Sequence, residues 1–179
     1  ALMLEQASGR SWEELVQSEV AGPLGLASWG IGWPATPERP DQPRGHWPGP
    51  RVQEFGVYDL GAFIDPAGDV HGSVLDLARY GHALATAPEG WIGQETLAML
   101  LAAPGDDPGS GYAMGLLREA VAGRAVALHN GSAGTFFAML VLDPATGESI
   151  AVAMNEGSFA NDAVARALAV AILDGSVRP

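Results

Sequence analysis

The sequence contains no cysteine, which excludes disulfide bonds, thiolate catalysis and cysteine-ligated metal sites. It contains no lysine either, so all nine basic residues are arginine, and every catalytic motif that requires a lysine is excluded. These nine basic residues stand against 21 acidic ones, and the net charge of −12 disfavours binding to nucleic acid or anionic lipid. No apolar run approaches the ~20 residues that a membrane-spanning helix needs.

What is present is typical of one folded domain. The 179 residues are 47% hydrophobic and 17% charged, and no low-complexity tract interrupts them. The chain begins at Ala1, without a methionine, in an apolar helix-favouring stretch that has no capping residue before it. We therefore expect residues 1–179 to be a single partial domain of a longer protein. The missing targeting signal consequently leaves the localisation unknown.

Hydrophobic periodicity and capping residues predict a series of helices. Their ranges are 1–8, 12–20, 74–87, 93–103 and 162–173. Gly9 and the segment 22–26 are expected to end the first two helices, while Ser11 and Ser73 supply N-terminal caps. The last helix is rich in alanine, which suits close packing against a sheet.

The segments between the helices carry candidate polar sites. Residues 33–64 are rich in proline and glycine and predict an ordered excursion over a pocket, with a decorative loop as the alternative. His71 is expected to lock a turn, and His82 is expected to be an ordinary helix residue rather than a metal ligand. The adjacent acids in 104–111 lack the spacing of a calcium-binding loop, so a solvated loop is expected there. No metal and no cofactor is expected.

The second half of the chain is rich in strands. β-branched, aromatic and aliphatic residues predict them at 112–118, 124–128, 135–142 and 149–154. Short connections make such strands antiparallel neighbours. The last two strands are apolar at nearly every position, which indicates that both of their faces are covered. The predicted fold class is α+β, with an antiparallel sheet covered by helices on both faces.

The connection between strands 124–128 and 135–142 is the candidate functional segment. It reads His129-Asn130-Gly131-Ser132-Ala133-Gly134. A histidine at a strand end, followed by residues too small to shield the main chain, can present both an imidazole and N–H groups to a substrate. The alternative is a hairpin whose glycines serve only the turn and whose histidine is structural.

Three other segments contribute, together with this one, to a family resemblance. They are Gly9-Arg10-Ser11-Trp12 through Pro23-Leu24-Gly25-Leu26, Pro66 through Tyr80, and Ile150 through Asn155. In this order the four segments resemble the class C β-lactamase and esterase branch of the serine β-lactamase and penicillin-binding-protein superfamily, whose third motif is Lys-Thr-Gly or His-x-Gly. The resemblance implies the C-terminal portion of a β-lactamase/transpeptidase-like fold. It also implies a serine acyl-hydrolase of esterase, peptidase or β-lactamase type that works through an acyl-enzyme.

The resemblance implies roles for individual residues. His129 would supply the cation or hydrogen-bond donor of the third motif, and Gly131 would let an acyl group lie along the strand. The backbone N–H of Ser132 would be one of two oxyanion-hole donors. Asn130 and Asn155 would bind substrate. Histidine in place of lysine is commoner in esterase and peptidase-like members, which argues against true β-lactam hydrolysis.

Two motifs of that family are absent. Ser-x-x-Lys cannot occur without lysine, and no tyrosine is followed two residues later by asparagine. The resemblance therefore implies that the chain lacks the N-terminal half of its domain and cannot turn over a small-molecule acyl substrate alone. The edge at 149–154 and a face of helix 162–173 should then be partly uncovered. Exported bacterial members imply a periplasmic or secreted location for the longer protein.

Two alternatives remain open. One is a catalytically inactive penicillin-binding-like module that only binds a peptide or acyl ligand. The other is a truncated gene product without function. Ser-x-x-Lys and Tyr-x-Asn upstream in the longer reading frame would support the enzyme, and their absence there would support the binding module.

Overall fold

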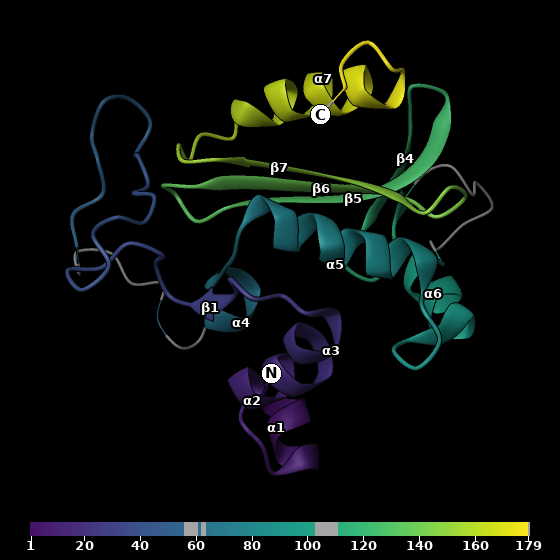
Figure 1. Ribbon diagram of the computed structural model, residues 1–179, viewed down its shortest axis with the longest axis horizontal. Coiled ribbons are helices and arrows are strands. Elements are labelled where there is room, and N and C mark those ends of the chain that lie inside the picture. Colours follow the sequence, from purple (N-terminus) through teal and green to yellow (C-terminus); the bar gives the residue numbers. More distant parts are fainter. Residues whose placement is uncertain (56–60, 62–63, 103–110, 179) are drawn as a thin grey trace.

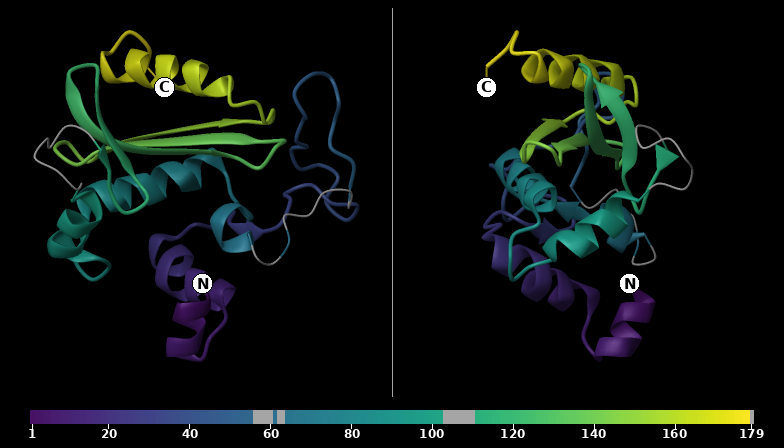
Figure 2. Two further views of the ribbon diagram at one scale, coloured as in Figure 1. Left: turned by 180° about the vertical axis from the view of Figure 1, so that it is seen from behind. Right: turned by 90° about the vertical axis from the view of Figure 1, so that its right-hand side faces the viewer.

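A computed structural model describes residues 1–55, 61, 64–102 and 111–178, and it has a layered architecture. Helix α7 (Asn161–Leu173) covers one face of a five-stranded sheet, and α5 (Val74–Thr86) and α6 (Gly93–Leu101) cover the other (Figure 1). The N-terminal helices lie beyond α5, away from the sheet, and two further views agree (Figure 2). This is the α+β arrangement, with helices on both faces of an antiparallel sheet, that the sequence predicted.

The strands follow one another in the sheet in the order of the chain. They are β3 (Gly111–Tyr112), β4 (Leu117–Val121), β5 (Arg124–Ser132), β6 (Phe137–Asp143) and β7 (Glu148–Met154). Every neighbouring pair is antiparallel. Val126 and Leu128 pack with the buried alanines of α7, whereas Ala127 between them packs with residues of α5. Side chains alternate across a strand, so both faces of β5 are buried at these positions.

The N-terminal region is more continuously helical than expected. Helices α1 (Leu2–Ser8) and α2 (Trp12–Val16) have the predicted ends, since Gly9 is left-handed with φ of 71° and Ser11 forms a complete capping box. A π-helical turn, η1 (Gln17–Ala21), leads from α2 directly into α3 (Gly22–Leu24). The segment 22–26 was expected to end the second helix, and the helical run does end there, at Gly25 with φ of 64°. Pro23 stands at the start of α3, directly after the π-helical turn.

The predicted strand 112–118 was wrong, because the chain turns in the middle of it. Gly115 has φ of 83°, and the N–H of Ala113 donates to the carbonyl of Leu116 at 2.7 Å. The segment is therefore a tight hairpin in which Tyr112 of β3 pairs with Leu117 of β4. A left-handed glycine bends a strand whose apolar pattern is otherwise uninterrupted.

Strand β5 is longer than predicted, and this changes the setting of the candidate segment. The bend was expected at 131–134, but pairing with β6 continues from His129 opposite Leu140 to Ser132 opposite Phe137. The turn occupies 133–136. Residues 129–132 are consequently strand residues, held by the apolar partner strand, rather than parts of a turn.

A second, two-stranded sheet organises the middle of the chain. Its strands β1 (Gly30–Ile31) and β2 (Val70–His71) flank the loop region, and a short helix, α4 (Asp65–Gly68), precedes β2. His71 was expected to lock the turn at 66–72, but Nδ1 of its ring lies 2.8 Å from the carbonyl oxygen of Gly32, so the bond joins the two strands of this sheet instead. His82 on α5 lies 2.7 Å from the carbonyl oxygen of Gly147. The acidic loop predicted at 104–111 falls almost entirely outside the described residues.

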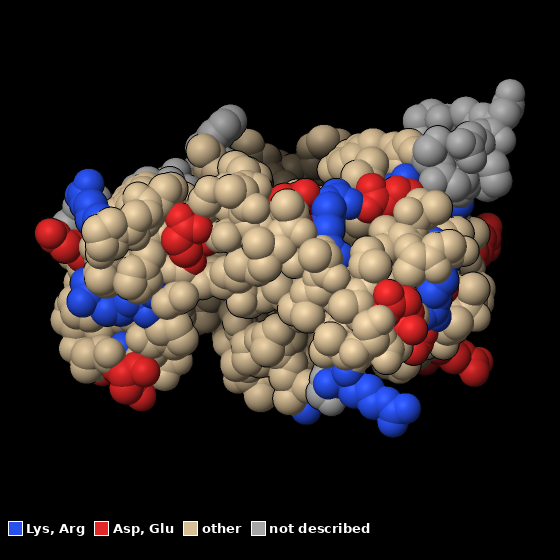
Figure 3. Space-filling view, turned by 90° about the horizontal axis from the view of Figure 1, so that it is seen from above, with Lys and Arg blue, Asp and Glu red and all other residues tan. Residues whose placement is uncertain are grey.

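Parts of the apolar surface are open. β7 has β6 as its strand neighbour in the described part of the chain, and Val164 and Leu168 on α7 are 58% and 39% exposed. These are the edge and the helix face that were expected to be partly uncovered. Seen from the α7 side, most of the surface is uncharged, with acidic and basic groups interspersed (Figure 3). None of the helices among the described residues has the length and hydropathy of a membrane span.

Candidate active site

The candidate segment lies on a part of β5 that extends past its neighbour. β4 pairs with β5 from Arg124 to Leu128 and then ends, whereas β6 continues alongside to Ser132. On the β4 side, no strand of the described chain pairs with residues 129–132. His129 is the first residue past the end of β4 and is exposed to solvent. The segment therefore offers an unpaired backbone edge and an accessible imidazole to a ligand.

Gly131 is a glycine that the fold itself does not require. Its φ lies outside the left-handed region, and a Cβ placed there would meet no atom of the described residues within 4 Å. Glycine inside a strand weakens the strand and often marks close approach by a ligand. The open space beside Gly131 is thus compatible with an acyl group lying along the strand.

The side chain of Ser132 belongs to the turn. Its hydroxyl donates to the carbonyl of Gly157 at 2.6 Å and accepts from the N–H of Gly134 at 3.0 Å. Gly157 packs so tightly on this turn that a Cβ there would lie 2.0 Å from the carbonyl of Gly134. The hydroxyl is thereby committed to fixing the turn, and a functional role for Ser132 falls to its backbone, as the resemblance implied.

The side chain of Asn130 points to the face of the sheet that α7 covers, opposite to the side chain of His129. Its amide group donates to Asp162 in the first turn of α7. Asp162 also accepts from Nε of Arg166 at 2.7 Å, and Arg166 in turn is paired with Glu119 on β4. Burial lowers the pKa of Arg166, but the hydrogen bond to Asp162 and the charge of Glu119 outweigh it, so the pKa is raised.

Asn155, predicted to bind substrate, holds the long loop. The side-chain amide of Asn155 donates to the backbone carbonyl of Arg44 at 3.2 Å, and the backbone carbonyl of Asn155 accepts from the N–H of His46 at 2.8 Å. The same N–H of His46 lies 2.9 Å from the carbonyl of Thr135, and the N–H of Gly157 donates to the carbonyl of His46 at 3.1 Å. The loop is therefore bound to the turn that follows the candidate segment.

Further contacts fix this loop in place. Thr135 is fully buried, and its hydroxyl bonds to the side chain of Gln53 at 2.9 Å. The ring of Phe136 stacks on Trp33, with centroids 6.1 Å apart and planes at 22°. The described part of the predicted 33–64 excursion is thus ordered against the end of the sheet. A pocket beneath it stays a prediction.

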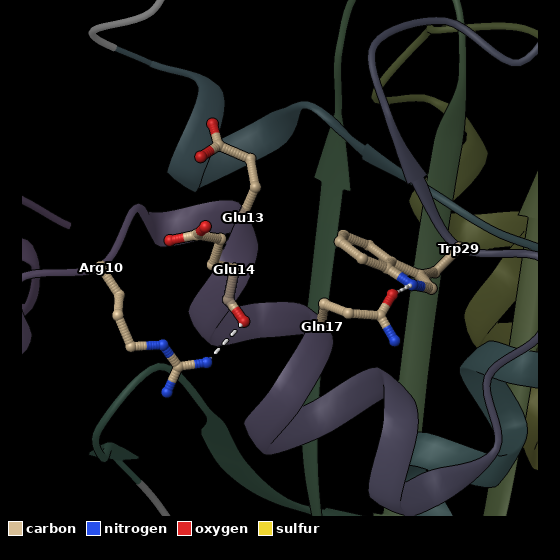
Figure 4. Close-up of a pocket in the computed structure, with 5 residues that line it drawn as sticks. All are labelled: Arg10, Glu13, Glu14, Gln17 and Trp29. Carbon is tan, nitrogen blue, oxygen red and sulfur yellow. Dashed lines mark hydrogen bonds between the residues drawn. The ribbon is translucent and has the colours of Figure 1, made fainter.

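An open groove of about 530 Å³ lies elsewhere, on the N-terminal helices. Arg10, Glu13, Glu14, Gln17 and Trp29 line it (Figure 4). Its polar groups are largely engaged with one another: Arg10 donates to the carbonyl of Glu14 at 3.1 Å, and the indole of Trp29 donates to Gln17 at 2.8 Å. None of the candidate residues lines this groove. The N-terminal helices that carry it lie across α5 from the sheet (Figure 1).

The structure brings the predicted residues together only in part. His129, Gly131 and the backbone of Ser132 lie along one open strand end, whereas the amides of Asn130 and Asn155 already have protein partners. Sequence reasoning missed Asp162 and the docking of the loop around His46 on the turn after β5, because no recognisable motif specifies these contacts. Within the described ranges, no three histidine or carboxylate side chains form a group that could hold a metal ion.

Comparison with solved structures finds several chains of similar fold. A penicillin-binding protein homologue from Pyrococcus abyssi matches with a TM-score of 0.76 and 24% identity over 97% of this chain and 40% of its own. A β-lactamase/D-alanine carboxypeptidase from Pseudomonas syringae matches with a TM-score of 0.77 and 14% identity over 99% and 57%. D-amino acid amidase from Ochrobactrum anthropi SV3 matches with a TM-score of 0.71 and 21% identity over 98% and 55%.

These solved chains agree in fold, and the chain spans only 40% to 57% of their length. No curated protein sequence matches. The family model described as Beta-lactamase matches residues 1–174, which is nearly the whole chain. By this match and by its fold, the chain belongs to the Beta-lactamase family of serine hydrolases and penicillin-binding-protein-like relatives.

Proposed function

We propose that this chain is the C-terminal part of a serine acyl-hydrolase and that residues 129–132 line its substrate site. Membership of the Beta-lactamase family supports the reaction class. The strand end that projects past β4 supports the location, because an extended acyl group can lie along an unpaired edge. The chain alone contains no Ser-x-x-Lys, so the nucleophile would come from residues outside it.

Gly131 is the single observation that carries the proposal. Neither its backbone conformation nor its packing calls for glycine, and open space lies where a side chain would stand. A substrate that must approach the strand closely would account for the residue.

The proposed roles follow from the position of each group. The serine oxygen attacks the carbonyl carbon of an ester or amide, and the N–H of Ser132 is one donor to the oxygen that becomes negative. The leaving alcohol or amine takes up the proton that the serine hydroxyl has given up as its bond to the carbonyl carbon breaks. Water then hydrolyses the acyl-enzyme, which releases the acid and returns a proton to the serine oxygen. The exposed imidazole of His129 donates a hydrogen bond either to the serine/tyrosine cluster or to an acidic group on the substrate.

The loop bound to the turn would form one wall of this site. His46 and Asn155 hold it beside residues 133–136, immediately after the candidate strand. Asn155 would then act on the substrate through the loop that it anchors. A direct contact would require its amide to leave the carbonyl of Arg44.

The proposed partner is the N-terminal half of the same domain. The free edge of β7 and the exposed Val164 and Leu168 of α7 are surfaces that such a half would cover. Strand edges and contiguous apolar surface are the features that further strands and helices bury.

Small-molecule amides and esters are the proposed substrates. Two of the similar structures are a D-amino acid amidase and a β-lactamase/D-alanine carboxypeptidase, which favours amide chemistry on small acyl compounds. The net charge of −12 disfavours a nucleic acid substrate.

Acylation by a fluorescent fluorophosphonate or β-lactam tests the proposal, with the longer reading frame and this 179-residue chain treated side by side. We expect label on the longer protein only, and weaker label when it carries Gly131→Ala. A longer protein that binds the β-lactam reversibly but is not labelled would instead support the inactive binding module. Label on the 179-residue chain would overturn the assignment of the nucleophile to residues outside it.

A further inference from the structure

Four polar side chains form a continuous chain of bonds behind the candidate strand. Asn130 on β5 donates to Asp162, Arg166 donates to the other carboxylate oxygen of Asp162 at 2.7 Å, and Arg166 also pairs with Glu119 on β4. We call these four residues the polar clamp. It joins α7 to two adjacent strands at the point where β5 extends past β4.

The chemistry of the clamp fixes how each group is used. A carboxylate only accepts hydrogen bonds, so Asn130 must present its NH₂ group to Asp162. Asp162 lies in the first turn of α7, where a negative charge is favourable, and it is four residues before Arg166 on the same helix. Arg166, Asp162 and Glu119 are 33%, 31% and 28% exposed at their side chains, so their pairing is only partly screened by water.

The clamp acts at Asn130, which faces α7, whereas its neighbours along the strand face away. Asn130 stands between His129 and Gly131, and successive strand residues point to opposite faces. Residues 129–132 pair with β6 on one side only, and a strand bonded on one side opens more easily than one bonded on both. β4 does not hold residues 129–132, because its pairing ends at Leu128. The bond from Asn130 to Asp162 therefore supplies a restraint from the face of the sheet that α7 covers.

We propose that Asn130, Asp162 and Arg166 are positioning residues that hold β5 at a fixed distance from α7. His129 and the N–H of Ser132 then meet a substrate in a constant geometry. The inference rests on the proposed function of this segment. It gives Asn130 a role behind the sheet in place of the substrate contact that the family resemblance implied.

Amide hydrogen exchange of the 179-residue chain, followed by NMR, tests the clamp. Asp162→Ala removes the acceptor, and we expect the protected amides of residues 129–132 to exchange at least about tenfold faster while those of 127 and 128, which β4 and β6 both pair, change little. Asp162→Asn keeps a carbonyl oxygen for the amide of Asn130 and should restore most of the protection. Glu148→Ala is the matched control, because it removes a carboxylate from the arginine pair at the other end of the sheet.

A second variant keeps the test decisive if Asp162→Ala unfolds. Asn130→Ala alone removes the donor of the same hydrogen bond and should accelerate the same amides. If Asp162→Ala folds, adding it to Asn130→Ala should accelerate them no further, because both changes remove one shared interaction. Equal acceleration in all strands, or none at 129–132, would overturn the clamp. Exchange does not depend on acylation, so a clamp without label in the acylation assay would refute the proposed function and leave the clamp in place.

Discussion

Two glycines near the candidate site have opposite physical reasons to be glycine. Gly157 is required by packing, because its Cβ would lie 2.0 Å from the carbonyl of Gly134. Gly131 has open space around it and an ordinary backbone conformation. The contrast makes the requirement at Gly131 testable without knowledge of the substrate.

Substitution of each glycine by alanine should therefore change stability in opposite directions. Gly131→Ala should raise the free energy of unfolding by about 0.5–1 kcal/mol, because alanine loses less backbone entropy in a strand. Gly157→Ala should lower it by about 3 kcal/mol or more through overpacking against backbone. Urea unfolding of both variants measures the difference, and a Gly131→Ala variant as unstable as Gly157→Ala would mean that the glycine serves the fold.

At residue scale the sequence indicated which residues lie together along the chain, but not the contacts that they make. His129 and Gly131 were identified from their order in a short motif, and they do lie on one strand end. The partners of Asn130 and Asn155 come from residues 32 and 111 positions away in the chain, and no local pattern specifies such contacts. From the sequence alone, both amides were therefore interpreted as groups available to bind substrate.

The first turn of α5 is bonded to Ser28, in the segment that follows the N-terminal helices, and we call this contact the α5 junction. Ser73 caps the helix by accepting from the N–H of Asp76, as its sequence pattern predicted. Asp76, which is 5% exposed, also accepts from the N–H of Ser28 at 2.7 Å and pairs with Arg79 at 2.9 Å. The hydrogen bonds from Ser28 and the charge of Arg79 lower the pKa of Asp76 below its ordinary 3.8.

This shift predicts how the stability of the α5 junction depends on pH. A carboxylate with a lowered pKa in the folded state stabilises that state above about pH 3.8, and the contribution is lost as the pH falls through the folded pKa. Asp76→Asn should cost about 1–3 kcal/mol at pH 7, and the difference from the unchanged chain should shrink below pH 4. Urea unfolding from pH 7 to pH 3 measures it.

The partner Ser28 provides the control for that experiment. Ser28→Ala keeps the backbone N–H bond and removes the hydroxyl, so part of the stabilisation should remain with the same pH dependence. A penalty for Asp76→Asn that stayed constant down to pH 3 would show that shape, rather than charge, holds the junction.

At element scale, long periodic segments were predicted well and short ones poorly. The helices ending at Gly9 and beginning at Ser73 have their predicted limits because capping is decided by adjacent residues. The hairpin at Gly115 was missed because one glycine bends a strand only when a partner strand is available. The extension of β5 to Ser132 was missed for the same reason, since pairing with β6 decides it.

At the scale of the whole molecule, α7 has two neighbouring stripes that differ in exposure. Ala165 and Ala169 on α7 are 0% and 1% exposed and pack on the sheet, whereas Val164 and Leu168, one position earlier in each turn, are open to solvent. Arg166, on the other side of Ala165, reaches β4. The helical repeat of about 100° per residue therefore places Val164 and Leu168 on the side of α7 away from β4, toward the β7 edge.

Polar replacements on the two stripes should behave differently. Val164→Thr with Leu168→Gln should leave the free energy of unfolding within about 0.5 kcal/mol and reduce self-association, because the open stripe contributes little to the core. Ala165→Gln is the matched control and should destabilise strongly, since it buries a polar group and overpacks the sheet. Thermal unfolding and sedimentation velocity distinguish them, and equal destabilisation by both would contradict an open stripe.

The sequence by itself determined the local and compositional properties of this protein. Absence of lysine and cysteine excludes whole classes of chemistry, capping residues set helix ends, and strands apolar on both faces require two covering layers. Only the tertiary structure decided that β5 runs past β4, that α7 binds Asn130 from behind, and that the loop around His46 docks on the turn. These features depend on contacts between residues far apart in the chain, and such contacts are set by how strands and helices pack together.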